Sequence, residues 1–353
     1  MRRELSIYLD LLRVAAALLV FLGHLSWAKL SGGALWPLQR LGHDGVIVFF
    51  VLSGFVIQYV TMHKETGLHD YAVARLARLY SVVLPALLLT LLCDQIGQNI
   101  RPDIYISEDQ TMPGLRLLAG GLFLSQSWGW NLTMLSNVAF WSLPYEFWYY
   151  QIFGAALFLR GRQRIFWVTL GCIMAGPAIL LYFPIWLFGA AAFFASTRTQ
   201  PGRASATLLF VISSLALLGL LVLEALRLIP RVEEAAFLPP SFSPVDYVTG
   251  ALVAVNLYAA AFVPLPLGRL GKPIAYLAGF TFALYLFHMP LLHLAATVVP
   301  SDWPVSLRGL AAGSFSLLAV FLLGLISERK KAYFARLVAR TLKPWVGAAD
   351  RRR

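Results

Sequence analysis

The chain has 353 residues, of which 59% are hydrophobic and only 13% are charged, and its mean hydropathy is +0.71. Soluble domains are about half apolar and about a quarter charged, so this composition excludes an ordinary soluble protein and predicts an all-α integral membrane protein. The net charge of +12 would suit nucleic-acid binding. However, much of this charge lies in short clusters beside apolar runs rather than in a soluble basic domain, so no nucleic-acid partner is expected.

Apolar runs predict about ten transmembrane helices, near residues 7–29, 43–61, 79–96, 138–158, 165–182, 184–197, 206–228, 247–267, 275–297 and 308–326. The 184–197 run is shorter than the roughly 20 residues of a typical span. Only Phe183 and Pro184 mark its junction with the preceding run, so either a tight hairpin partner or a re-entrant segment is compatible with it. The N-terminus resembles a signal peptide superficially, but its long apolar region contains Asp10 and Arg13 and predicts an uncleaved first span.

Lys and Arg are distributed unequally between the two predicted sides of the membrane. Of the 29 cations, 21 fall on the side of both termini, 7 fall on the other side, and Arg13 lies within the first span. The positive-inside rule therefore predicts cytoplasmic termini for a multi-pass protein of the bacterial cytoplasmic (inner) membrane. We expect a transmembrane domain at 1–328 and a basic cytoplasmic tail at 329–353. In the tail, cations alternate with Tyr, Phe, Leu and Val, which favours binding to anionic membrane lipids.

The first predicted span carries three ionisable residues, Asp10, Arg13 and His24. Each costs on the order of 3 kcal/mol or more in hydrocarbon, so it needs a partner, a water-filled cavity or a task. Eleven residues separate Arg13 from His24, and at about 100° and about 1.5 Å per residue they share one helix face roughly 16 Å apart. Asp10 is placed for an i,i+3 ion pair with Arg13. Snorkelling of Arg13 and a structural hydrogen bond from His24 are the alternatives to a polar wall.

Further polar positions recur in later segments. The second span begins with His43 and Asp44 and contains Ser53 and Gly54, whose small side chains allow close approach of either a thin ligand or a neighbouring helix. Arg75 and Arg78 lie one helical turn apart at the cytoplasmic boundary, where two guanidinium groups suit phosphates or simply follow the positive-inside rule.

Two later motifs add an acid and an imidazole. Glu146 lies in WSLPYEFWYY (141–150), and His288 lies in YLFHMPLL (285–292). The sequence contains no HExxH, GxSxG or glycine-rich nucleotide loop, and Cys93 and Cys172 provide no zinc spacing. No metal site is therefore expected.

Taken in order, these motifs resemble the acyltransferase 3 family of integral membrane O-acyltransferases, which includes O-antigen and exopolysaccharide acetylases. The resemblance covers nearly the whole chain. It rests on LDLLRVAAALLVFLGH with its Arg-x10-His spacing, on GHDGVIVFFVLSGFVI, on the Arg-x-x-Arg pair, and on the Trp-Ser-Leu-x-x-Glu and Tyr-Leu-x-His-x-Pro patterns.

The resemblance implies an acyl-CoA donor, usually acetyl-CoA, that enters from the cytoplasm, and a glycan or lipid-linked sugar acceptor on the far side. By position, His24 matches the essential histidine of the family, and Arg13, Arg75 and Arg78 match its essential arginines. We expect the arginines to hold the CoA phosphates, the pantetheine arm to pass Ser53 and Gly54, and His24 to act as general base or as transient acyl carrier.

Asp44 or Glu146 would orient the imidazole of His24 or bind sugar hydroxyls, and the sequence does not choose between these roles. Asp10, His43 and His288 are expected to support the site or contact substrate. The alternative function is a multi-span transporter or exporter that uses an intramembrane Asp, Arg and His path. Such proteins are often built from repeated halves, and the sequence shows no internal repeat.

Overall fold

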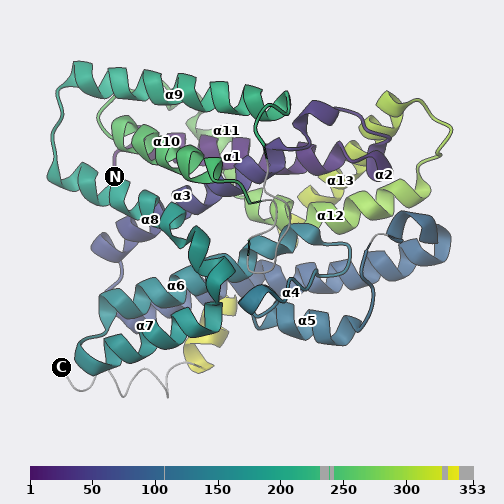
Figure 1. The fold of residues 1–353 in the computed structure, drawn as a ribbon, viewed down its shortest axis with the longest axis horizontal. Helices are drawn as coiled ribbons and strands as arrows, with labels where there is room; N and C mark the ends of the chain where they lie inside the picture. Colours follow the sequence, from purple (N-terminus) through teal and green to yellow (C-terminus); the bar gives the residue numbers. More distant parts are fainter. Residues whose placement is uncertain (107, 231–237, 239–241, 328–332, 342–353) are drawn as a thin grey trace.

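The computed structural model describes residues 1–106, 108–230, 238, 242–327 and 333–341, and within these ranges it is a bundle of α-helices without a strand ladder (Figure 1). The helices are α1 (Arg3–Leu25), α2 (Ala28–Ser31), α3 (Leu41–His63), α4 (Leu68–Ile100), α5 (Pro113–Gly121), α6 (Ser142–Phe158), α7 (Gly161–Ala175), α8 (Pro177–Arg198), α9 (Arg203–Ala225), α10 (Val245–Ala260), α11 (Gly271–Ala278), α12 (Thr281–Val298) and α13 (Val305–Ser327). Short 3-10 turns lie at Trp36–Leu38, Pro102–Tyr105, Ser127–Gly129, Val138–Trp141 and Gly268–Leu270.

Seven helices of the described residues are long and apolar enough to cross a membrane, namely α1, α3, α4, α8, α9, α12 and α13. The predicted class of all-α membrane protein is thereby confirmed. Three further predicted spans correspond to α6, α7 and α10, which have 17, 15 and 16 residues. These helices are shorter than the roughly 20 residues that cross a bilayer without tilt or thinning. The count of ten spans therefore stays a prediction.

The predicted boundary at Phe183 and Pro184 is wrong. The chain breaks instead at Gly176, which has a φ of +80°, and α8 then runs without interruption from Pro177 to Arg198. A left-handed φ favours glycine, and proline suits the first turn of a helix. Pro184 lies inside α8, as prolines do in membrane helices whose neighbours satisfy the freed carbonyl. The 184–197 segment is thus the second part of one long helix.

Another predicted span is also divided differently. The 275–297 run forms α11 and α12, which are separated at Gly279 and Phe280. In contrast, α4 begins eleven residues before the predicted 79–96 run, at Leu68, and continues for 33 residues. Arg75 and Arg78 are therefore helical residues within α4.

The helix α3 packs closely against three other helices, α1, α8 and α10. A Cβ atom added to Gly54 of α3 would lie 2.0 Å from the carbonyl oxygen of Trp186, and one added to Gly189 of α8 would lie 1.9 Å from that of Val51. These two helices touch backbone to backbone. The helix α12 packs against α1, α4 and α13 and is buried along most of its length.

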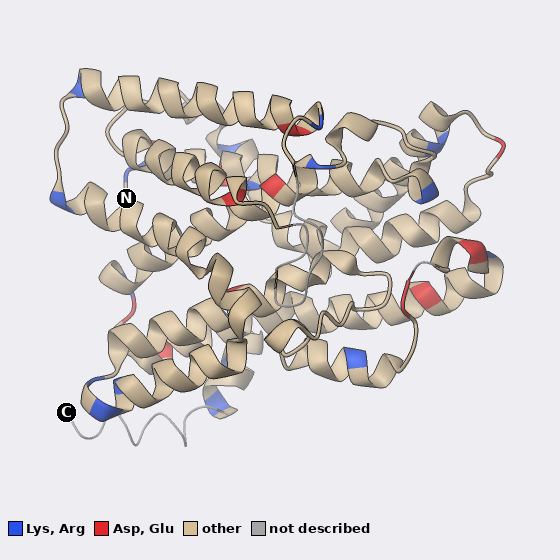
Figure 2. Ribbon diagram, viewed as in Figure 1, with Lys and Arg blue, Asp and Glu red and all other residues tan. Residues whose placement is uncertain are grey.

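Cationic residues gather toward the end of the bundle where the N-terminus lies (Figure 2). This distribution agrees with the predicted cytoplasmic placement of that end. Of the predicted tail, residues 333–341 are helical, whereas 329–332 and 342–353 lie outside the described residues. Between the predicted spans 206–228 and 247–267, residues 231–237 and 239–241 also lie outside them.

Candidate active site

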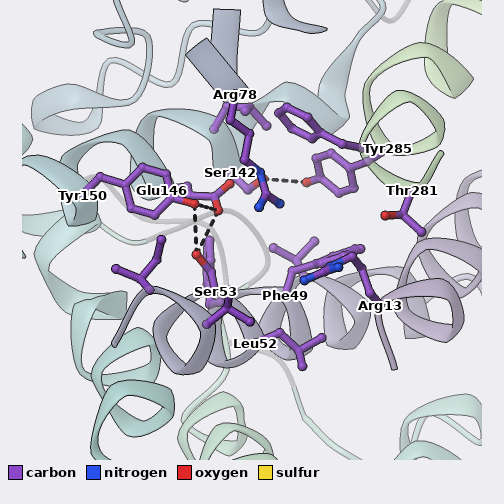
Figure 3. A pocket seen from close by; sticks show the side chains of 16 residues that line it. Arg13, Phe49, Leu52, Ser53, Arg78, Ser142, Glu146, Tyr150, Thr281 and Tyr285 are labelled. Atoms are coloured by element: carbon purple, nitrogen blue, oxygen red, sulfur yellow. Dashed lines mark hydrogen bonds between the residues drawn. The ribbon is translucent and has the colours of Figure 1, made fainter. Parts of the chain in front are cut away.

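An inner cavity lies between α1, α3, α4, α6 and α12 (Figure 3). Its polar and aromatic walls come from segments far apart in the sequence: Arg13, Phe49, Ser53, Arg78, Ser142, Glu146, Tyr150, Thr281 and Tyr285. Arg13 and Arg78 direct their guanidinium groups into the middle of this space. Arg13 Nη1 also lies 2.9 Å from Asp10 Oδ1, which confirms the predicted ion pair.

Opposite the two arginines, a hydrogen-bonded group surrounds Glu146. Ser53 Oγ donates to Glu146 Oε1 at 2.9 Å, and Tyr150 donates to the same oxygen. Trp186 Nε1 donates to Ser53 Oγ at 3.1 Å. The carboxylate is thereby fixed so that it faces the cavity. Two cations and one acid line the space, which favours an anionic or strongly polar ligand.

The structure separates the predicted pairs Ser53–Gly54 and Arg75–Arg78. Ser53 lines the inner cavity, whereas Gly54 faces the backbone of α8, so the close approach at Gly54 is helix packing. Arg78 lines the cavity, whereas Arg75 is buried, pairs with Glu65 and lies 5.4 Å from the centre of the Tyr71 ring. Burial raises the pKa of the Glu65 carboxyl, and the charge of Arg75 opposes that rise.

An outer cavity adjoins the inner one and shares two of its lining residues. Its lining residues come from α1, α3 and the segments around them: Gly23, His24, Trp27, Gln39, Arg40, Gly42, His43, Val46, Trp141, Arg227 and Tyr285. Val46 and Tyr285 line both cavities. The predicted stripe on the first span therefore faces two neighbouring spaces, with Arg13 on the inner one and His24 on the outer one.

His24 contacts His288 and neither of the two predicted carboxylates. His288 Nδ1 lies 2.8 Å from the carbonyl oxygen of Leu284, so in the neutral ring this nitrogen carries the proton and Nε2 is an acceptor. His24 Nδ1 lies 3.0 Å from His288 Nε2 and 3.0 Å from the carbonyl oxygen of Val20. Both partners accept, so His24 Nδ1 carries its proton and Nε2 holds the free lone pair.

His43 occupies the same outer cavity but has an acidic partner. Its Nε2 lies 3.0 Å from Asp246 Oδ2, and its ring stacks on Trp141 with the planes 9° apart. Asp44, in contrast, is buried and lines neither cavity. Of the two acids proposed to orient His24 or bind sugar hydroxyls, only Glu146 therefore faces a cavity.

Several residues of the site were not predicted from the sequence. Ser142 and Tyr150 belong to the same motif as Glu146, and the four-residue spacing between Glu146 and Tyr150 places them on one helix face. Asp246 lies in the first turn of an apolar helix. An acid in an apolar run is the same signal that pointed to Asp10. Tyr182 carries no comparable signal, because a tyrosine in an aromatic-rich span is ordinary.

The geometry described so far defines an α-helical membrane protein with two neighbouring cavities, each lined in part by charged side chains, and a histidine whose Nε2 lone pair is unused in the His24–His288 pair. Comparison with known families assigns it further: the model of an acyltransferase domain matches residues 6–326. The chain belongs to this family, the acyltransferase 3 family, and the resemblance and enzyme class inferred from its motifs are confirmed.

Two characterised relatives agree with this assignment. An O-acetyl transferase of Shigella phage Sf6 is 26% identical over 211 residues, which cover 54% of this chain and 61% of the phage protein. The chain thus spans less than two thirds of that relative. The acyltransferase MdmB of Streptomyces mycarofaciens is 26% identical over 384 aligned positions, which cover 96% of this chain and 94% of that protein. No solved structure matches the chain.

Proposed function

We propose that this protein is a membrane O-acyltransferase that takes an acyl group, with acetyl preferred, from acyl-CoA on the cytoplasmic side of a bacterial inner membrane. The acceptor is a hydroxyl of a glycan or lipid-linked sugar on the opposite side. The observation that carries the proposal is a pair of neighbouring cavities that share Val46 and Tyr285 as lining residues, one with two converging arginines and the other with His24.

The inner cavity suits the donor. Arg13 and Arg78 supply forked, permanently charged donors, and phosphates are the anionic part of CoA. Ser53 and Glu146 add polar contacts along the same wall. Because Arg75 pairs with Glu65 away from this wall, the donor role falls to Arg13 and Arg78.

The outer cavity suits the acceptor, and His24 supplies the base. Its Nε2 takes the proton of the acceptor hydroxyl while that oxygen attacks the acyl carbonyl carbon. The new C–O bond forms, the C–S bond of the thioester breaks, and the proton passes from His24 to the departing thiolate of CoA. His288 holds the Nδ1 proton of His24 in place throughout, so that Nε2 stays available.

The test compares His24→Ala with His63→Ala, which changes an exposed histidine at the far end of α3. Purified protein is supplied with labelled acetyl-CoA, and free CoA and acylated product are both measured. We expect His24→Ala to reduce turnover by about 10²-fold or more and His63→Ala to match the wild type. Full activity in His24→Ala would contradict the mechanism, and absence of CoA release by the wild type would contradict the function.

A further inference from the structure

The outer cavity holds a second histidine that the acyl-transfer step does not use. α1 and α3 meet at two glycines, where a Cβ atom added to Gly23 would lie 3.0 Å from the Cα atom of Gly42. The next residue of each helix is a histidine, and both His24 and His43 line the cavity. One imidazole is enough to deprotonate one hydroxyl, so His43 requires a separate explanation.

His43 is held by an acid network. Asp246 is only 2% exposed, and its Oδ2 atom accepts hydrogen bonds from three donors: His43 Nε2 at 3.0 Å, the backbone nitrogen of Ser243 at 2.9 Å, and the hydroxyl of Tyr182. A buried carboxylate needs such partners. The network fixes the tautomer of His43 with a proton on Nε2, and so it leaves Nδ1 as the ring nitrogen able to bind a ligand.

The surroundings of His43 suit a ring-shaped, oxygen-rich molecule. Trp141 lies parallel to the imidazole, with ring centres 6.1 Å apart, and lines the cavity beside it. Other lining residues with polar groups are His24, Trp27, Gln39, Arg40, Arg227 and Tyr285. An aromatic surface with a few directed polar groups is the usual composition of a small-molecule site, and these groups match hydroxyl and ether oxygens.

We infer that the acceptor is recognised at two points: His24 takes the reacting hydroxyl, and His43 forms a hydrogen bond with a second oxygen of the same ring. This inference rests on the proposed function and narrows the acceptor to a sugar ring that carries a second oxygen within reach of the acylated one. His43 is then an acceptor-binding residue, and Asp246 and Tyr182 are positioning residues that act through it.

The test uses His43→Gln in the purified full-length protein, because a glutamine amide retains a donor near the Nε2 position for Asp246 but has no counterpart of Nδ1. The probes are methyl β-D-glucopyranoside and its four monodeoxy analogues, with labelled acetyl-CoA as donor. Apart from the analogue that lacks the acylated hydroxyl itself, we expect one deoxy analogue to show at least tenfold lower kcat/KM than the parent glycoside with the wild type.

In His43→Gln the kcat/KM for the parent glycoside should already be at least tenfold lower, mainly because the acceptor KM is higher. The same deoxy change should then lower the kcat/KM of this variant by less than a further twofold. Tyr182→Phe should give a smaller rise in the acceptor KM, and His63→Gln should match the wild type. A structural role alone would not make the deoxy effect disappear.

Three results would overturn the inference. The first is that the losses from His43→Gln and from the deoxy change add up. The second is that His43→Gln raises the KM for acetyl-CoA as much as the KM for the acceptor. The third is that the wild type consumes acetyl-CoA but acylates none of the glycosides. Failure of the proposed function looks different, because the wild type would then consume no acetyl-CoA at all.

Discussion

At the scale of single residues, the chemistry of the site depends on which polar atoms of each side chain are already hydrogen-bonded within the protein. His24 uses Nδ1 for His288 and the backbone, and Arg13 uses one guanidinium nitrogen for Asp10. Both residues also line a cavity. Spacing along the first span places them on one stripe, but their partners decide what each can do.

Replacement of His288 tests its positioning role. Without an acceptor at its Nε2 position, the Nδ1 proton of His24 is no longer directed, and the base is oriented less well. We expect His288→Leu to lower kcat by about tenfold or more with little change in the KM for acetyl-CoA. His288→Gln, which offers an oxygen near the same position, should recover part of the loss. Equal defects in the two variants would indicate packing alone.

The two arginines of α4 should respond differently to substitution. Arg78 lines the inner cavity, whereas Arg75 pairs with Glu65. Loss of a charged hydrogen bond to a phosphate costs about 1.5–3 kcal/mol, so Arg78→Ala should raise the KM for acetyl-CoA by roughly 10- to 100-fold. Arg75→Ala should instead lower thermal stability, because it leaves Glu65 buried without its partner. If titrations show that Arg75→Ala weakens acetyl-CoA binding and Arg78→Ala does not, Arg78 does not bind the donor.

At the scale of helices, close backbone contacts determine which walls face each other. The α3–α8 contact through Gly54 and Gly189 brings Trp186 to Ser53, and the α1–α3 contact through Gly23 and Gly42 brings His24 and His43 to one cavity. Small residues serve this purpose in membrane bundles because they permit backbones to approach each other. The polar walls therefore depend on glycines that never touch a ligand.

Substitution of these glycines should be costly where space is absent. In Gly54→Ala the new methyl group would meet the carbonyl oxygen of Trp186, which belongs to backbone and cannot rotate away. Such overpacking costs about 1–3 kcal/mol or more, so the apparent melting temperature of the detergent-solubilised protein should fall. Gly219→Ala on α9, where no described atom lies within 4 Å of the added Cβ, is the matched control and should be neutral or slightly stabilising. Equal melting temperatures would refute the packing explanation.

At the scale of the whole molecule, the proposed function assigns the donor to the inner cavity and the acceptor to the outer cavity of one membrane-spanning bundle. Cations concentrate toward the end that carries the N-terminus (Figure 2), and the Arg13 cavity precedes the His24 cavity along α1. This order matches a donor that arrives from the cytoplasm and an acceptor on the other side.

The orientation can be measured with single cysteines in a background where Cys93 and Cys172 are changed to Ala. Gly202→Cys lies between α8 and α9 and Asp302→Cys between α12 and α13, and both positions are exposed. A membrane-impermeant maleimide added to intact cells should label Asp302→Cys and should label Gly202→Cys only after permeabilisation. Labelling of Gly202→Cys from outside would reverse the predicted topology.

Local patterns were enough to predict most helices and the Asp10–Arg13 pair, because both depend on near neighbours in the chain. They failed at Pro184, where the apolar run contains a proline that the surrounding helices tolerate, and at α6, α7 and α10, whose short lengths leave the span count open. Motif order was also enough to identify the acyltransferase family, which the match over residues 6–326 confirms.

The partners of the functional groups could not be predicted in the same way. His288 meets His24 across 264 positions of sequence, and Asp246 meets His43 across 203. Sequence spacing alone thus determined that Arg13 and His24 lie on one face of the first span. Only the tertiary structure decided which imidazole has a carboxylate, which arginine faces the cavity, and that Gly54 serves packing, because these outcomes depend on contacts between helices whose relative rotation no single segment specifies.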